Sequence, residues 1–416
     1  MTSTEAGSRA TYASVLADQQ FRILFGSRSL AIVADTLRIL ALSILVYTAT
    51  GSPLLAAVTY GIGFVPQAVG GLLLGSLADR LPPRPLLVTG YLMEAVVAVL
   101  LGATTMPVAA ALTLVGAVAC VTPAFNGASS RLVAATLTGD RYVLGRSLSS
   151  MSSSAAQLVG LAAGGAMVAV LGARHALLLC AGLHLLAAGV VRLRLRAQLA
   201  PISGTGLRGT VGATLTGNRE LLGNRRVRAL LLAQWIPAGL SVGAEALLVP
   251  YAGVRQLPAG SAGVLLAALP VGMLLGDLIV GRLLMPRTRE RLVAPLVALL
   301  GAPLLVFATR PGLVVSIILL VAAGAGFAYG LGLQRPFLEA LPTGRQGQAF
   351  TLLSTGLMTV QGLGPVVIGA ASERLGVPLS MALAGLLVLT CAALLVRPAT
   401  AWRHGKAQPS RSVAPR

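Results

Sequence analysis

Four carboxylate side chains lie inside long apolar stretches of this sequence, where ionisable residues are scarce: Asp35, Glu94, Glu245 and Asp277. A charged group in such surroundings is costly and usually faces a cavity or a partner of opposite charge. Arg38 follows Asp35 by three residues, so on a helix the two side chains share a face and can pair. An aspartate that exchanges its arginine contact for a proton can couple proton movement to another process. The alternative is a static ion pair that only fixes helix packing.

Residues typical of bond-making chemistry are not grouped along the sequence. No Ser/His/Asp set and no phosphate-binding loop of the GxxxxGK[ST] type occurs. The histidines and cysteines lack the spacing of metal ligands; they are His175, His184, His404, Cys120, Cys180 and Cys391. The sequence therefore predicts no catalytic residue, no metal ion and no cofactor. A membrane-embedded enzyme or receptor remains the weaker alternative class.

The elements that must position the buried carboxylates are membrane-spanning helices. The 416 residues are 56% hydrophobic and only 11% charged, with a mean hydropathy of +0.84, whereas a soluble domain carries about 25% charged residues. A spanning helix needs about 20 apolar residues. The uncharged run from Ile39 to Ala78 is longer and holds the turn sequence TGSP, so it indicates two helices. A membrane β-barrel is not expected, because these runs lack the strict apolar/polar alternation of its strands.

Twelve spans are predicted in this way, which makes the chain an all-α membrane protein. A soluble all-helical protein is the alternative, and the strong hydropathy signal disfavours it. The predicted centres lie near residues 36, 66, 95, 116, 160, 183, 240, 271, 301, 323, 359 and 387.

The basic residues set the predicted orientation. Lys and Arg total 32 and the formal net charge is +20. With both termini inside, almost all of them fall on the inner side, and only Arg174, Arg255, Arg310 and Arg374 fall outside. This bias follows the positive-inside rule and indicates a multi-pass protein of the cell membrane with cytoplasmic termini. Nucleic acid is not the expected partner, because the arginines are scattered over inner loops, beside anionic lipid.

An internal repeat divides the chain into two halves of six helices. At one constant offset Gln157 falls on Gln361, Gly160 on Gly364 and Gly165 on Gly369. Small residues in such a pattern permit tight helix packing, and Pro365 follows Gly364. The predicted units are an N-terminal half at 1–191, a basic cytoplasmic linker at 192–228, a C-terminal half at 229–396 and a disordered cytoplasmic tail at 397–416. Two parallel six-helix halves are a transporter architecture.

The loop GSLADRLPPR resembles the signature between helices two and three of the major facilitator superfamily. Gly75, Asp79, Arg80 and Arg84 match that signature, while prolines replace a glycine and a basic residue. The resemblance implies the major facilitator fold and a cytoplasmic gate, in which Asp79 is held near the start of helix eleven, around residue 347. An ordinary topogenic loop with a surface ion pair is the alternative.

The same resemblance implies that helices one, four, seven and ten line a central cavity. Asp35 and Arg38 would lie there on helix one and Glu245 on helix seven, as the leading candidates for proton coupling. Glu94 and Asp277 are further candidates that reach the cavity less readily, and Glu94 has a structural role as its alternative. Candidates for contact with substrate are Asn126, Gln234, Trp235 and Tyr329.

Two further segments resemble the bacterial siderophore- and macrolide-exporter branch of that superfamily: FRILFGSRSLAIVADTLRILALSILVYTATGSPLLAA and LEALPTGRQGQAFTLLSTGLMTVQGLGP. The resemblance implies a secondary active, proton-driven exporter of a drug, an antibiotic or a siderophore-like metabolite. We expect a monomer, with protons, lipid and substrate as its partners. Aromatic residues make up only 4% of the chain, which favours a largely apolar substrate. The family's proline on helix five is replaced by Leu161, so import of a small organic solute remains the alternative.

The charge distribution makes a testable prediction about topology. A reporter active only in the cytoplasm should be active when fused within residues 192–228, because this segment carries the densest group of arginines. The same reporter fused in the loop that holds Arg174 should be silent. An active linker fusion with a reporter that works only outside the cell would contradict the predicted orientation.

Overall fold

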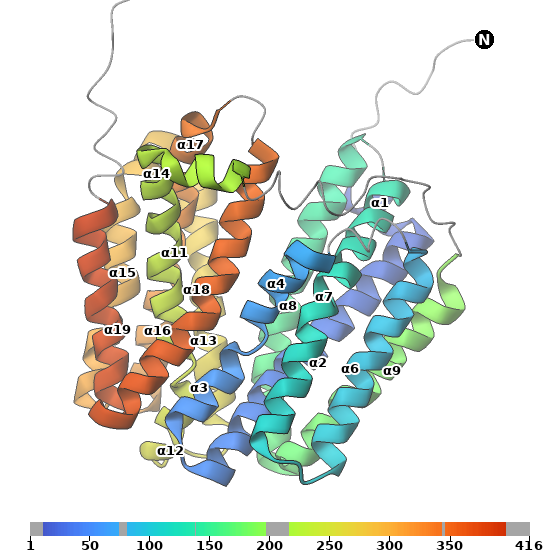
Figure 1. Cartoon of the computed structure of the whole chain (residues 1–416), viewed down its shortest axis with the longest axis horizontal. Coiled ribbons are helices and arrows are strands. Elements are labelled where there is room, and N and C mark those ends of the chain that lie inside the picture. Colours follow the sequence, from blue (N-terminus) through green and yellow to red (C-terminus); the bar gives the residue numbers. More distant parts are fainter. Residues whose placement is uncertain (1–10, 75–80, 138, 197–215, 343–345, 397–416) are drawn as a thin grey trace, which may run out of the picture.

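The computed structural model describes residues 11–74, 81–137, 139–196, 216–342 and 346–396, and these residues form helices and connecting turns with no strand among them (Figure 1). Within the described part, eleven helices are long and apolar enough to cross a membrane, and a shorter apolar helix covers Val293–Thr309. Each of the twelve predicted centres falls in one of these helices, which confirms the predicted all-α membrane fold.

The N-terminal half contains the following described helices: α1 (Tyr12–Leu16), α2 (Gln19–Thr50), α3 (Pro53–Gly61), α4 (Phe64–Leu74), α6 (Pro83–Ala103), α7 (Val108–Thr136), α8 (Gly139–Leu171) and α9 (Ala173–Arg194). The predicted turn TGSP separates α2 from α3. Gly51 ends α2 with a φ of 65°, a left-handed conformation that glycine adopts without strain. Ser52 then caps α3 by accepting a hydrogen bond from the Leu55 amide, and Pro53 occupies the first turn.

The C-terminal half contains α11 (Arg225–Glu245), α12 (Leu248–Val254), α13 (Ser261–Leu278), α14 (Pro286–Arg291), α15 (Val293–Leu305), α16 (Leu313–Gly326), α17 (Tyr329–Ala340), α18 (Gln346–Leu375) and α19 (Val377–Cys391). Several spans consist of two helices in series, such as α11 with α12 and α16 with α17. Helix α9 continues to Arg194 and α11 begins at Arg225, so helix covers the outer parts of the predicted linker. The tail at 397–416 lies outside the described residues.

The two halves form separate bundles that meet along a small set of helices (Figure 1). Helix α8 packs on α2 of its own half and on α13 of the other. Its counterpart in the repeat, α18, packs on α11 of its own half and on α3 and α4 of the other. The equivalent placement of α8 and α18 confirms that the sequence repeat reflects two pseudo-symmetric halves.

Glycine allows these helices to approach closely. A Cβ atom at Gly160 of α8 would collide with Thr36 of α2, and one at Gly364 of α18 would collide with Gly239 of α11. Across the halves, a Cβ atom at Gly165 would lie only 2.8 Å from the Gly260 carbonyl oxygen. The small residues that the repeat identifies therefore lie where neighbouring helices come close together, and such close packing supplies the attraction between helices in lipid.

A polar contact joins the halves at the end opposite the N-terminus. The carboxylate of Glu373 on α18 accepts hydrogen bonds from the Ser52 hydroxyl at 2.6 Å and from the Leu54 amide at 3.2 Å. The carboxylate lies at the N-terminus of α3, where the positive end of the helix dipole stabilises an anion. The bundles diverge toward the end that carries the N-terminus, where no described helix pair of opposite halves makes comparable contacts (Figure 1).

The packing makes a testable prediction about glycine. Gly364→Ala should lower the thermal unfolding temperature of the detergent-purified protein, with a loss of about 1–3 kcal/mol typical of overpacking, because its Cβ atom has no room against Gly239. Gly182→Ala on α9 is the matched control, since nothing lies within 4 Å of a Cβ atom there. Equal unfolding temperatures for the two variants would contradict a rigid contact between α18 and α11.

Candidate functional site

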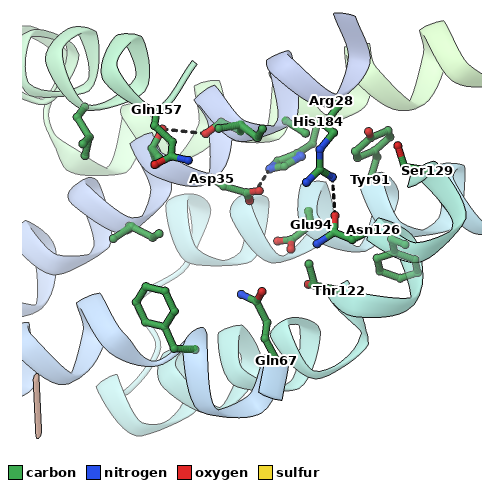
Figure 2. A pocket seen from close by; sticks show the side chains of 18 of the residues that line it. Arg28, Asp35, Gln67, Tyr91, Glu94, Thr122, Asn126, Ser129, Gln157 and His184 are labelled. Atoms are coloured by element: carbon green, nitrogen blue, oxygen red, sulfur yellow. Dashed lines mark hydrogen bonds and ion pairs between the residues drawn. The ribbon is translucent and has the colours of Figure 1, made fainter. Parts of the chain in front are cut away.

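A cavity of about 350 Å³ lies mainly within the N-terminal bundle and is closed on one side by α11 and α13 of the other half. More than half of its lining residues have polar side chains, although the helices that supply them are apolar (Figure 2). The ionisable lining residues are Arg28, Asp35, Tyr60, Tyr91, Glu94, His184 and Glu245. The polar residues scattered along the sequence are thus concentrated at one place in the fold.

Arg38 holds two carboxylates in this region. Its Nη2 atom lies 3.1 Å from Asp35 Oδ1, one turn away on α2, and 3.2 Å from Glu94 Oε2 on α6. Arg38 and Glu94 are each 8% exposed, whereas the Asp35 side chain is 38% exposed toward the cavity. The pair that the spacing of Asp35 and Arg38 predicts is therefore formed, and Glu94 completes a cluster of two acids around one guanidinium.

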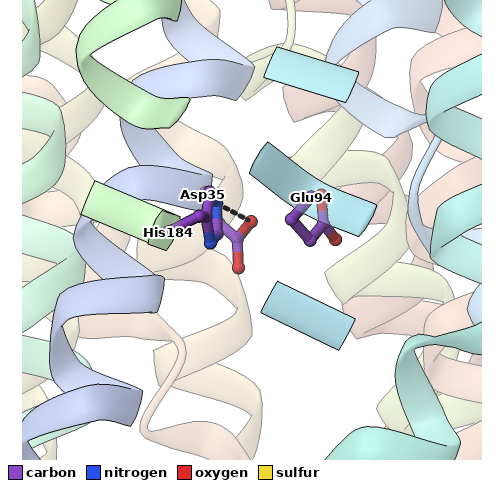
Figure 3. Close-up of side chains that lie close together, drawn as sticks. All are labelled: Asp35, Glu94 and His184. Carbon is purple, nitrogen blue, oxygen red and sulfur yellow. Dashed lines mark ion pairs between the residues drawn. The ribbon is translucent and has the colours of Figure 1, made fainter. Parts of the chain in front are cut away.

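His184 on α9 is a fourth member of this cluster. Its Nε2 atom lies 3.5 Å from Asp35 Oδ1, and its side chain is buried (Figure 3). His184 is not predicted from sequence spacing, because the histidines are far apart along the chain. Its position in an uncharged apolar run is the signal that was missed, because an imidazole at membrane depth is an ionisable group like the four carboxylates.

The possible ligand atoms of Asp35, Glu94 and His184 all lie within 4.8 Å of one another, a spacing that could hold a metal ion. Arg38 opposes that use, because its guanidinium already places a fixed positive charge against both carboxylates. A cation between the same oxygens would be repelled. The donor set fits reversible protonation better than metal binding.

Some buried polar atoms of the cluster have no hydrogen-bond partner among the described residues: Arg38 Nε, Glu94 Oε2, His184 Nδ1 and His184 Nε2. The contact between Arg38 and Glu94 is therefore an electrostatic one without hydrogen-bond geometry. An unsatisfied buried acceptor is costly. A proton on Glu94 or His184 would convert an acceptor atom that has no partner into a hydrogen-bond donor.

Glu245 faces the same cavity from the C-terminal half. It ends α11, where the span breaks before α12, and is 8% exposed. Its carboxylate interacts with the Tyr60 hydroxyl of α3. This contact links the two halves directly at the cavity wall.

The family of the chain follows from a match that covers most of the two bundles. Residues 24–337, more than half of the chain, match the Major Facilitator Superfamily. The chain belongs to this superfamily. Its members are transporters rather than enzymes. No curated protein sequence matches the chain.

Solved structures of superfamily-type transporters share the fold of this protein. One is a bacterial homologue of the human lysosomal transporter Spinster in an inward-facing, unoccupied conformation, with a TM-score of 0.67, 15% identity, and coverage of 95% of this chain and 98% of that one. A mutant of the nucleoside transporter NupG has a TM-score of 0.68 and 14% identity, with coverage of 92% of this chain and 98% of that one. A POT family transporter in complex with 5-aminolevulinic acid has a TM-score of 0.70 and 12% identity, with coverage of 91% of this chain and 95% of that one.

Only some of the predicted proton-coupling residues of this superfamily transporter line the cavity. Asp35 and Glu245 line the cavity, and Arg38 lies directly behind Asp35. Glu94, expected to reach the cavity less readily, also lines it. Asp277 does not, because its side chain is exposed on the outer surface of α13 among leucines.

The predicted substrate contacts also differ in position. Asn126 lines the cavity, as does Gln157 of the helix-packing pattern. Trp235, Gln234 and Tyr329 do not line it. The Trp235 indole donates to the Leu353 carbonyl at 2.9 Å, and the Tyr329 hydroxyl donates to the Gln234 carbonyl at 2.7 Å. These buried donors take nearby backbone carbonyls as partners and so join α11 to α18 and α17.

Most of the predicted cytoplasmic gate lies outside the described residues, including Gly75, Asp79 and Arg80. Arg84 is described in the first turn of α6, and its guanidinium donates to the carbonyl of Arg192 on α9. Helix α18 begins at Gln346, one residue from the expected start of helix eleven.

The cluster makes a testable prediction about stability. Arg38→Met should reduce the free energy of unfolding by about 3–5 kcal/mol, because it leaves the buried carboxylate of Glu94 and the half-buried carboxylate of Asp35 without a counter-ion. Arg335→Met should cost at most about 1 kcal/mol, because the Arg335–Glu339 pair is exposed. Both variants would be measured by denaturant titration of the purified protein.

Adding Glu94→Gln to Arg38→Met should restore part of the lost stability, because one carboxylate then remains instead of two. Equal losses for Arg38→Met and Arg335→Met would contradict the view that Arg38 neutralises the buried acids.

Proposed function

We propose that this chain is a proton-coupled secondary active exporter of a small organic compound. The observation that carries the proposal is the position of one guanidinium, Arg38, between the carboxylates of Asp35 and Glu94, both of which line the cavity. The driving force is the proton gradient, and no cofactor is required. One chain contains the entire cavity, which supports a monomer as the functional unit.

The charge balance of the cluster explains how it takes up a proton. Two carboxylates and one guanidinium leave one surplus negative charge when His184 is neutral. In apolar surroundings that charge is costly, and one proton on Glu94 or Asp35 removes it. His184, 3.5 Å from Asp35, offers a second acceptor. The cluster can therefore change between a charged and a neutral state as the halves move.

Alternating access requires the two halves to rock about a site between them. Glu245 supports a role in this motion, since its carboxylate lies in the C-terminal half and its partner Tyr60 in the N-terminal half. Movement of the halves would break this contact and free Glu245 for protonation. Glu245 is thus the second proton-coupling candidate.

The direction of transport rests on topology and resemblance. With both termini in the cytoplasm, the contact between Ser52 and Glu373 closes the external end, and the cavity can load from the cytoplasm. The two sequence segments that resemble the siderophore and macrolide exporters support the same direction. Import of a small organic solute is the alternative that the transport experiment must separate.

The proposed organisation follows the sequence repeat. Residues 1–191 and 229–396 form the halves, with residues 192–228 and 397–416 as cytoplasmic linker and tail. The loop with Gly75, Asp79, Arg80 and Arg84 would close the cytoplasmic end by engaging the start of α18. The phenyl and alkyl groups of Phe64, Phe125 and Leu161 line the cavity and would contact an apolar part of the substrate.

The coupling proposal is tested by neutralising single carboxylates. Everted membrane vesicles with the wild-type chain should accumulate the neutral dye N-phenyl-1-naphthylamine when a proton gradient is imposed. Asp35→Asn, Glu94→Gln and Glu245→Gln would be measured separately, and at least one should lose the gradient-driven part while gradient-independent exchange persists. Glu339→Gln, an exposed carboxylate on α17, should behave as wild type.

Full coupling in all three variants would place the proton site elsewhere. Gradient-driven accumulation only in right-side-out vesicles would favour import, and dye movement without any gradient dependence would contradict proton coupling.

A further inference from the structure

We propose that Arg28 and Asn126 bind the anionic group of the substrate, so that the preferred substrate is a small organic anion with an apolar body. The proposal rests on the proposed transport function and specifies its substrate class. It starts from a positive charge that the proton-coupling cluster does not use.

Arg28 lies on α2 and lines the cavity, half-buried. No carboxylate of the described residues lies within ion-pairing distance of it. Its Nη1 atom donates to the side-chain oxygen of Asn126 on α7 at 2.6 Å, a neutral acceptor (Figure 2). A guanidinium inside a membrane-spanning helix without a counter-ion is costly. A bound anion would supply the missing charge.

The acids of the cavity are engaged elsewhere. Asp35 and Glu94 contact Arg38, and Glu245 interacts with the Tyr60 hydroxyl. Arg28 and Arg38 are ten residues apart, about 15 Å along the helix axis. The cavity therefore has two separate charged places on one helix: the acidic cluster around Arg38 and the unpaired cation at Arg28.

Further hydrogen-bond donors surround Arg28. Tyr91 and Ser129 lie beside it in the cavity wall (Figure 2). Asn126 uses its oxygen toward Arg28, which leaves the amide nitrogen of the same side chain as a donor. A second, smaller cavity shares Arg28 and Ser129 and is lined by four more serines, whose hydroxyls bond to backbone carbonyls or to one another: Ser29, Ser149, Ser152 and Ser153. Arginine with amide and hydroxyl donors is the usual set that recognises a carboxylate, sulfonate or phosphate oxygen.

The rest of the cavity fits the body of such a molecule. Phe64, Leu87 and Phe125 line it together with the polar residues. A volume of about 350 Å³ is near the lower end for small-molecule sites, so the body should be no larger than a few fused rings. A mixed lining of this kind selects an amphipathic molecule over a wholly apolar one.

An anionic substrate changes what the membrane potential contributes to transport. Export of a monovalent anion against one inward proton moves two positive charges inward, so an inside-negative potential drives both movements. Export of a neutral compound for one proton moves one charge. A stronger dependence of transport on potential is thus a second signature of an anionic substrate.

The test measures binding to the full-length protein in detergent, without any gradient. Three probes share one ring system and differ in charge: naphthalene-2-sulfonate, naphthalene-2-sulfonamide and (2-naphthylmethyl)trimethylammonium. A ligand that binds the folded state raises its thermal unfolding temperature. The sulfonate should give half of its maximal shift at a concentration at least about tenfold lower than the other two.

Arg28→Gln should abolish the preference for the sulfonate over the sulfonamide, whereas Arg28→Lys should keep part of the preference. Arg374→Gln, an exposed arginine on α18, is the control and should match wild type. An equal response of wild type to all three probes, a preference for the ammonium probe, or no response to any probe would overturn the inference. These results need no variant and no proton gradient, so they leave the coupling proposal to be decided by its own transport experiment.

Discussion

The guanidinium of Arg38 is the charge on which the interior of this protein depends. Two carboxylates that are distant in sequence, Asp35 and Glu94, lie within 3.2 Å of it, on α2 and α6. In water such contacts contribute little, but at membrane depth an unpaired charge is far more costly. The pairing therefore fixes how α2 and α6 face each other, and His184 extends the same constraint to α9.

Packing around this polar centre relies on small residues. In lipid there is no hydrophobic force to bring helices together, so close backbone contact must supply the attraction. Gly160 and Gly364 occupy equivalent positions in the two halves, each against the first helix of its own bundle. Between the halves the polar contact of Glu373 with Ser52 lies at one end. An interface of glycines with few polar contacts can open without leaving many unsatisfied groups, which suits a transporter that must alternate between two states.

Helix α2 carries both charged places of the cavity. Arg28 and Asp35 are seven residues apart, two turns of helix, so they lie on the same face, and Arg38 follows within one further turn. A substrate held at Arg28 and a proton held near Asp35 would thus act on one rigid element. Coupling between them needs no long chain of contacts, because any shift of α2 relative to α6, α7 and α9 alters both places together.

Local features were readable from the sequence, and contacts between helices were not. The positions of the spans, the turn at Gly51 and Ser52 and the pair of Asp35 with Arg38 depend on neighbouring residues, so hydropathy and helical spacing determine them. The equivalence of α8 and α18 was visible because a repeat preserves small residues at fixed spacing. The sequence also identified Glu94 as a buried acid, but it gave no reason to expect the contact with Arg38.

The tertiary structure alone decided which polar residues share a cavity. It brought His184 and Arg28 to the cavity wall and directed Trp235, Gln234 and Tyr329 to backbone partners outside it. A side chain on a spanning helix can face lipid, a neighbouring helix or the cavity. Which of these it faces depends on how the helix is rotated about its own axis, and the amino-acid composition of the helix hardly determines that rotation. That rotation is set by the partners each polar group finds on other helices, and their distances exist only once the bundle has formed.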